Sequence, residues 1–171
     1  MNPLLCKGFG VFAIAFGGSA LFTLAKADII LNATDSLRSN AFVVYDWPLV
    51  LRRGAVIAAD MPPVLADDFG EHAYVKVIRG LPGDEIVVLD DGVTCVAGYC
   101  APPLIKDGAA WAPAIAPMVI PEGKYAVFGT SENSLDSRYD VIGLIPEETI
   151  HAAGFSVPFP QWEVLAGWFA K

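Results

Sequence analysis

One stretch of the chain, residues 72–84, reads HAYVKVIRGLPGD and predicts a β-strand that ends in a tight turn. Aromatic and β-branched residues alternate with other side chains up to Gly80, and the turn signal Leu-Pro-Gly-Asp follows. Because successive side chains of a strand point to opposite faces, Lys76 shares a face with Tyr74 and Ile78. The stretch therefore places a lysine on an otherwise apolar face of a strand.

Similar short runs recur along the chain between turn residues, and together they predict a mainly β protein: an antiparallel β domain with a barrel- or sandwich-like core. The predicted strands are Asp28–Leu31, Ala41–Tyr45, Ala55–Ala59, His72–Arg79, Glu85–Leu89, Lys124–Phe128 and Val141–Ile145. No amphipathic helix of ordinary length is expected among them. Residues 101–121 are rich in Ala and Pro and are expected to form an irregular excursion.

The N-terminal segment predicts a membrane anchor. Between Lys7 and Lys26 lie 18 uncharged residues, Gly8–Ala25. A helix of that length reaches about 27 Å, close to the roughly 30 Å of a bilayer core. A cleavable signal peptide is the alternative, because residues 25–27 have the small-x-small pattern of a cleavage site. We expect residues 1–27 to form the anchor or signal peptide and residues 28–171 to form the β domain.

Composition excludes several classes of function. The chain has 171 residues and a formal net charge of −8, with 11 Lys and Arg against 19 Asp and Glu. An acidic surface repels phosphate backbones, so no nucleic-acid partner is expected. With 2 His and 3 Cys, multi-His metal sites and four-Cys zinc sites are excluded, and no metal or cofactor is expected. Cys95 and Cys100 are expected to form a disulfide outside the cytoplasm, with two free thiols as the alternative.

Candidate catalytic hydroxyls follow the apolar segment in Asn32–Ser36, which reads NATDS. If this segment is extended, Thr34 and Ser36 lie on one face, where one hydroxyl can attack a carbonyl while the other donates to the oxyanion. A loop or helix cap is the ordinary explanation of such a cluster. Burial of Lys76 would lower its pKa toward the range of a general base, whereas a solvated lysine on an edge strand would have no such role.

Three ordered blocks resemble the type I signal peptidases. Tyr74–Asp84 resembles their lysine box, Ser134–Tyr139 (SLDSRY) resembles their Ser-x-Asp-Ser-Arg-Tyr box, and Gly143–Glu147 resembles their Gly-x-x-Pro-Glu motif. With the apolar N-terminus leading into Thr-x-Ser, the resemblance spans residues 32–147. The small size and the Asn-x-Thr-x-Ser opening look most like the TraF-type peptidases of conjugative transfer, which mature pilin precursors.

The resemblance implies a single N-terminal transmembrane helix followed by the antiparallel catalytic domain of a signal peptidase. It implies Ser36 as the nucleophile and Lys76 as the general base. Thr34 falls where the family has its oxyanion-hole hydroxyl, and Ser134 falls where a serine orients the lysine amine. His72 has the same strand parity as Lys76 and is a rival base, although a solvated histidine at the strand end is the simpler interpretation.

Two further features of the resemblance concern the shape of the site. Asp136 and Arg138 match a structural ion pair of the family. The sequence departs from the family just after the nucleophile, where Leu37–Ser39 stands in place of Met and Pro. The geometry of the substrate pocket is therefore expected to differ.

The function expected from these residues is that of a membrane-anchored serine endopeptidase that processes an exported precursor, such as a pilin subunit for conjugative transfer. The precursor would bind as an extended strand beside the Ser36 and Lys76 segments. The other expected partner is membrane lipid, with a single-pass anchor in the inner membrane and the catalytic domain on the periplasmic side. The alternatives are a general preprotein signal peptidase and a non-catalytic anchored β scaffold of a secretion apparatus.

Overall fold

The computed structural model describes residues 27–31, 36, 37, 39, 41–46, 49–70 and 72–157. The predicted anchor, Gly8–Ala25, and the candidate hydroxyl of Thr34 lie outside these residues. In the ranges just given, no helix combines the length and apolar character needed to cross a membrane.

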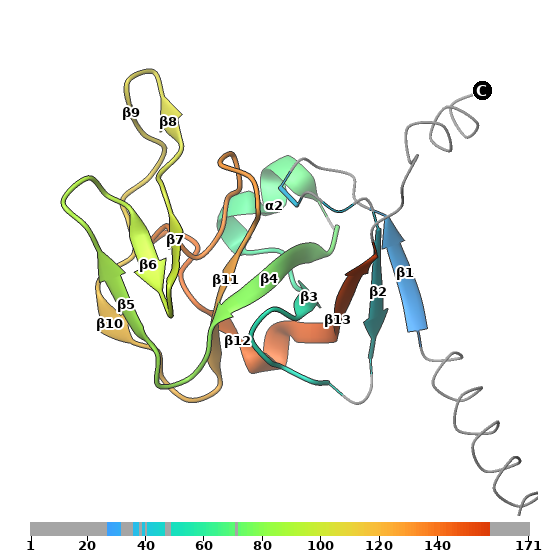
Figure 1. The fold of residues 1–171 in the computed structure, drawn as a ribbon. Helices are drawn as coiled ribbons and strands as arrows, with labels where there is room; N and C mark the ends of the chain where they lie inside the picture. Colours follow the sequence, from blue (N-terminus) through green and yellow to red (C-terminus); the bar gives the residue numbers. More distant parts are fainter. Residues whose placement is uncertain are drawn as a thin grey trace, which may run out of the picture.

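Within the described residues, a seven-stranded sheet carries most of the fold (Figure 1). Its strands lie in the order β1 (Ala27–Leu31), β2 (Ala41–Tyr45), β13 (Ile150–Val157), β3 (Val56–Ala59), β4 (Tyr74–Gly80), β11 (Lys124–Phe128) and β12 (Ile145–Pro146). All neighbouring strands in this sheet are antiparallel. The predicted mainly β, antiparallel class is confirmed.

A second sheet lies at the other end of the domain, on the left of Figure 1. Its order is β10 (Met118–Val119), β5 (Glu85–Val88), β6 (Thr94–Val96) and β7 (Tyr99–Ala101). A small hairpin, β8 (Ile105–Lys106) and β9 (Ala109–Ala110), follows β7. The stretch 101–121, expected to be irregular, therefore contains this hairpin and an edge strand joined by irregular segments.

The sequence-based strand boundaries agree with the structure to within two residues at both ends except in one case. The predicted strand Val141–Ile145 is wrong, because only Ile145 of it pairs, in β12. The N–H groups of Ile142 and Gly143 donate instead to the carbonyl of Tyr139, at 3.2 and 2.9 Å, and so close a turn. Gly143 has φ of 68°, a left-handed conformation that favours glycine.

Several elements have no counterpart among the predicted strands, namely β6, β7, β8, β9, β10, β13, a short helix and a 3₁₀ turn. Helix α2 (Pro63–Phe69) is short; it begins at a proline, which suits the first helical turn, and ends at Gly70, whose φ is 63°. A 3₁₀ turn, Glu147–Thr149, leads into β13. Strand β13 lies between β2 and β3, where a Cβ on Gly154 would overlap the Val43 carbonyl. That close approach explains why this position carries glycine.

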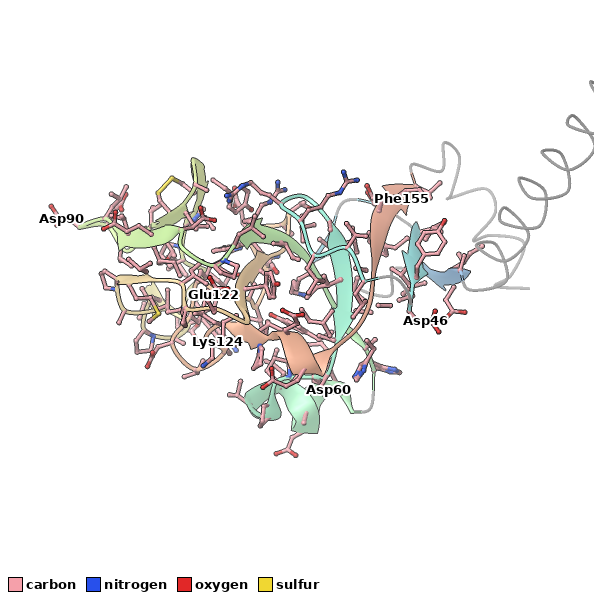
Figure 2. All side chains as sticks on the ribbon, turned by 90° about the horizontal axis from the view of Figure 1, so that it is seen from below. Asp46, Asp60, Asp90, Glu122, Lys124 and Phe155 are labelled. Atoms are coloured by element: carbon pink, nitrogen blue, oxygen red, sulfur yellow. A yellow bond between two sulfur atoms is a disulfide. The ribbon has the colours of Figure 1, made fainter. Side chains whose placement is uncertain are left out.

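The large sheet buries side chains on both faces, and β4 contributes to both. Tyr74 and Ile78 pack in a cluster on one face with residues such as Ile57 and Val127. Val77 packs on the other with Phe42 and others. A third cluster joins the two sheets, around Ile86, Val96, Ile120 and Phe128. Acidic side chains such as Asp46, Asp60 and Asp90 point outward (Figure 2).

Candidate active site

Strand β4 carries Lys76 into the interior of the protein. Only 6% of its side chain is exposed, and its Nζ lies 3.3 Å from the Oγ of Ser36. The same Nζ donates to the carbonyl of Val75 at 3.2 Å. Because β3 and β4 pair in register over Tyr74–Val77, the backbone of Lys76 has a well-defined position. The amine is thus within hydrogen-bond reach of a hydroxyl 40 residues earlier in the chain.

The loop after β11 holds Ser36 in place. The Ser36 carbonyl accepts hydrogen bonds from the N–H groups of Thr130, at 2.9 Å, and Ser131, at 3.2 Å. Gly129 lies close behind, since a Cβ at this position would overlap both the Ser36 carbonyl and the side chain of Ser134. A glycine here lets three segments of the chain approach one another.

The pKa of Lys76 is lowered from its ordinary 10.5 to about 8. The main cause is burial, which disfavours the charged amine. The negative charge of Asp136 opposes this effect and the positive charge of Arg138 adds to it. About a tenth of Lys76 is therefore uncharged at pH 7 and about half at pH 8, which gives the neutral amine that a general base requires.

Tyr74 lies beside the amine. The Lys76 Nζ is 4.5 Å from the centroid of the Tyr74 ring, and the Tyr74 hydroxyl donates to the Leu135 carbonyl at 3.0 Å. Burial raises the pKa of Tyr74, so its hydroxyl is neutral and remains a donor. The ring is held by Leu135, next to Ser134, and forms one wall of the lysine environment.

The Ser134–Arg138 segment supplies a buried polar framework. Asp136 is 0% exposed and Arg138 is 2% exposed; the Arg138 Nε donates to Asp136 Oδ1 at 2.8 Å and Nη2 donates to Oδ2 at 2.9 Å. Asp136 Oδ2 also accepts the Gly129 N–H at 2.8 Å. The ion pair therefore fixes the Gly129 loop that holds Ser36. Ser134 is fully buried, and its Oγ has no hydrogen-bond partner in the described part of the chain.

Strand β4 has an open edge next to the Ser36–Lys76 contact. On one side β3 pairs with all of Tyr74–Val77. On the other side β11 pairs only from Val77 to Gly80. Among the strands that the structure describes, none pairs with Tyr74–Lys76 on this second side. The backbone there can accept an additional strand.

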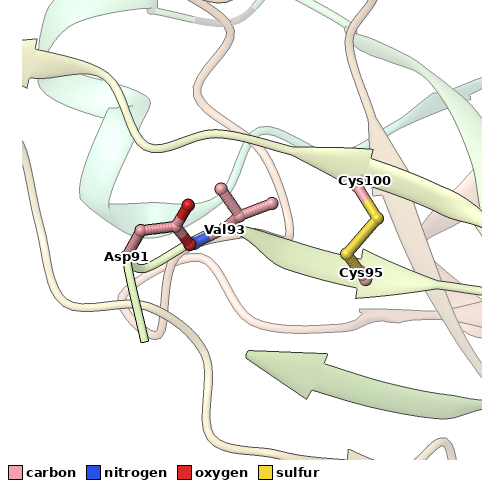
Figure 3. The surroundings of a disulfide bond; sticks show 4 residues. All are labelled: Asp91, Val93, Cys95 and Cys100. Atoms are coloured by element: carbon pink, nitrogen blue, oxygen red, sulfur yellow. A yellow bond between two sulfur atoms is a disulfide. The ribbon is translucent and has the colours of Figure 1, made fainter. Parts of the chain in front are cut away.

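The remaining candidate residues lie away from the amine. His72 is exposed, just before β4 begins. Cys95 and Cys100 form a disulfide, directly opposite each other in β6 and β7 (Figure 3). In the turn before β6, the Val93 N–H donates to Asp91 Oδ1 at 3.2 Å (Figure 3). No group of three or more His, Cys, Asp or Glu residues in the described ranges is arranged to hold a metal ion.

Sequence reasoning gave no role in the site to two neighbours of the Ser36–Lys76 contact, Tyr74 and Gly129. The strand alternation already placed Tyr74 on the face of Lys76, so a signal for it existed. Gly129 carries no such local signal, because its requirement for glycine comes from the approach of Ser36 and Ser134, which are distant from each other in sequence.

Comparisons with known proteins identify the family of the chain. The model of the family "Signal peptidase, peptidase S26" matches residues 5–159. The chain is 30% identical over 122 residues to signal peptidase I of Bacillus licheniformis, covering 66% of this chain and 62% of that one. It is 29% identical over 119 residues to signal peptidase I T of Bacillus subtilis strain 168, covering 64% and 58%. The chain thus spans about three fifths of the length of these curated relatives.

Among solved structures, the chain is similar to a crystal structure of a signal peptidase I from Enterococcus faecalis V583. The TM-score is 0.38 at 20% identity, over 63% of this chain and 97% of that one.

Proposed function

This chain belongs to the peptidase S26 family of signal peptidases, and from that membership we propose that it is a serine endopeptidase that cleaves exported precursor proteins. The observation that carries the proposal is the contact between a buried amine and a hydroxyl, Lys76 Nζ and Ser36 Oγ, at 3.3 Å. A pKa of about 8 for Lys76 supports its role as the base. Ser36 is the nucleophile.

The proposed reaction passes two protons through Lys76, one in each half of the reaction. The neutral Lys76 amine takes the Ser36 hydroxyl proton as Oγ attacks the scissile carbonyl and forms a tetrahedral intermediate. The resulting ammonium gives that proton to the leaving amine, and an ester on Ser36 remains. A water molecule then attacks the ester while Lys76 accepts its proton, and the return of that proton to Ser36 restores the enzyme. The Thr34 hydroxyl and the Ser36 N–H are the proposed donors to the oxyanion.

The precursor is proposed to bind as an extra strand on the open edge of β4. An extended segment that pairs with Tyr74–Lys76 gains main-chain hydrogen bonds and brings its scissile bond to Ser36. Ser134 is proposed to orient the Lys76 amine, and the ion pair of Asp136 with Arg138 to maintain the surrounding loops. The buried ion pair supports the second role. Ser134 is buried, and its Oγ makes no hydrogen bond to Lys76 within the described residues.

We further propose that residues 1–27 anchor the protein in the inner membrane and that residues 28–171 act on its periplasmic side. The uncharged run Gly8–Ala25 supports the anchor. The natural substrate is proposed to be a pilin-type precursor of conjugative transfer, which the Asn-x-Thr-x-Ser opening of residues 32–36 supports. A general preprotein peptidase is the second candidate, because the curated relatives are named signal peptidase I.

The proposal is tested with the full chain in detergent and two peptides, one with the sequence of a pilin precursor and one with that of a general signal peptide. Mass spectrometry is expected to find a single cut after a small residue with the wild type and none with Ser36→Ala. Preference for one peptide decides between the two substrate classes. If the wild type cuts neither peptide while its fold is intact, the protein is a non-catalytic anchored module and the proposal is wrong.

A further inference from the structure

A cavity of about 160 Å³ lies beside Ser36, on the opposite face of the large sheet from Tyr74 and Ile78. Its apolar walls come from several strands and from the segment after Ser36, namely Leu37, Phe42, Val56 and Val77. Its polar walls come from Arg79, from two serines and from Thr130, whose N–H donates to the Ser36 carbonyl at 2.9 Å. The cavity therefore lies next to the proposed nucleophile, but Ser36 is not one of the residues that line it.

Arg79 gives this cavity a positive charge that is not neutralised in the described part of the protein. Its guanidinium stacks 4.5 Å from the ring centroid of Tyr99, and its buried Nε has no hydrogen-bond partner among the residues described. By contrast, Arg53 pairs with Asp84 and Arg138 with Asp136. A buried donor without an acceptor is unfavourable until an acceptor arrives. An arginine in a cavity with both polar and apolar walls fits a carboxylate on a short apolar stem.

The strand pairing indicates which part of a substrate reaches the cavity. A strand added beside Tyr74–Lys76 cannot continue along β4 because β11 occupies that edge from Val77 onward. The polypeptide must therefore leave the sheet near Ser36, past Thr130. If the leader pairs with the open edge and runs parallel to β4, the residues that follow the scissile bond are the ones that leave the sheet there.

We propose that the cavity binds an acidic side chain at the first or second position after the scissile bond and that Arg79 determines this preference. The inference rests on the proposed function and specifies its substrate class: precursors whose mature part begins with an acidic residue. Val77 and Arg79 line the cavity from the same face of β4, while Lys76 points to the other. Arg79 thus acts on substrate selection and takes no part in the proton transfer.

The test uses peptides that share one leader and differ in a single residue, Glu or Gln, at the first or the second position after the cut. The wild type is expected to cleave one Glu peptide with a kcat/KM about tenfold above that of its Gln partner, which corresponds to ~1.4 kcal/mol for a charge-assisted contact. Arg79→Gln is expected to cleave both at the Gln rate. Arg79→Glu is expected to prefer a Lys peptide.

The control variant is Lys106→Gln, which removes a positive charge from the exposed hairpin strand β8 and should keep the preference for Glu. If the wild type cleaves Glu and Gln peptides equally, the inference is wrong while the proposed function stands. The inference is also wrong if Arg79→Gln keeps the preference for Glu, or if this variant loses cleavage of both peptides to the same extent. If no peptide is cut by the wild type, the proposed function itself fails.

Discussion

The Lys76 amine lies 4.5 Å from the centroid of the Tyr74 ring, and both side chains are buried on the same face of β4. An aromatic face attracts the ammonium form of lysine, whereas burial disfavours it. The two effects act in opposite directions on one proton. The ring therefore stabilises the protonated form of the buried amine. Lys76 needs that form while it carries the proton from Ser36 to the leaving group.

The first prediction concerns the pH dependence of cleavage. Because Lys76 must be neutral to act as a base and its pKa is lowered to about 8, kcat/KM is expected to rise with pH to a plateau with a midpoint near 8. The measurement is a pH profile of peptide cleavage from roughly three pH units below that pKa to roughly two above it. An acidic optimum would contradict a lysine base.

The second prediction distinguishes the effect of the Tyr74 ring on the Lys76 amine from the effect of the Tyr74 hydroxyl on stability. Tyr74→Leu removes the cation–π contact, worth about 0.5–1 kcal/mol, and is expected to lower the midpoint of the pH profile by about half a unit. Tyr74→Phe keeps the ring and the midpoint but loses the hydrogen bond to Leu135, at a cost of about 1 kcal/mol in the free energy of unfolding. Equal midpoints for the two variants would show that the ring has no effect on the amine.

The third prediction concerns stability. The pKa of Lys76 is lower in the folded protein, about 8, than its ordinary value of 10.5, so the unfolded chain binds the proton more tightly. The free energy of unfolding therefore rises with pH between about 8 and 10.5 and carries a penalty of about 3 kcal/mol below that window. Lys76→Met removes the buried charge and is expected to be more stable than the wild type at pH 7.

The measurement is urea unfolding of the two proteins at a series of pH values. Lys76→Met should lose its advantage as the pH rises through 10.5, above which the wild-type amine is neutral in the unfolded chain as well. Ser36→Ala serves as the control, since it removes the other partner of the 3.3 Å contact and leaves the buried amine in place. A pH-independent difference between Lys76→Met and the wild type would contradict the assigned cause.

Local sequence pattern was sufficient for the strands that are bounded by turns and rich in β-branched or aromatic residues, such as Ala41–Tyr45 and Lys124–Phe128. It failed for β13, whose centre is Ala152, Ala153 and Gly154. Small residues have weak strand propensity, and their conformation is imposed by pairing with β2 and β3 on both sides.

The candidate site shows the same division. Strand alternation predicted the faces of Tyr74 and Arg79 relative to Lys76. No periodicity could predict that Ser36 lies next to Lys76, because the contact joins segments 40 residues apart. Only the resemblance to the family's motifs predicted that these two residues lie close together. The unpartnered Nε of Arg79 depends on what surrounds it in three dimensions, so the sequence held no sign of it.

The fourth prediction concerns the disulfide of the β6–β7 hairpin. Replacing both Cys95 and Cys100 by Ser is expected to lower stability by about 2 kcal/mol, since the bond closes a short loop, and Tm by about 5 °C. Cleavage at room temperature should persist because the Tyr99 hydroxyl still donates to the Gly129 carbonyl. Cys6→Ser controls for thiol removal. Loss of cleavage by the folded double variant would contradict a purely structural role.

The fifth prediction concerns the buried ion pair. Asp136→Asn leaves Arg138 charged, buried and uncompensated, and is expected to lower the free energy of unfolding by about 3–5 kcal/mol. Arg53→Gln, which breaks a more exposed ion pair with Asp84, should cost at most about 1 kcal/mol. Urea unfolding at pH 7 measures both. Similar decreases in the free energy of unfolding for the two variants would show that burial has little effect on what the Asp136–Arg138 ion pair contributes to stability.

The same Asp136→Asn variant also tests the electrostatics of the base. In the wild type the charge of Asp136 raises the pKa of Lys76, while Arg138 lowers it. Once the carboxylate is neutral, only the lowering influences of burial and Arg138 remain, so the midpoint of the cleavage profile should move below 8. The assay is run at a temperature where the variant is folded, as judged by circular dichroism. A midpoint that rises instead would mean that Asp136 does not act on Lys76 through its charge.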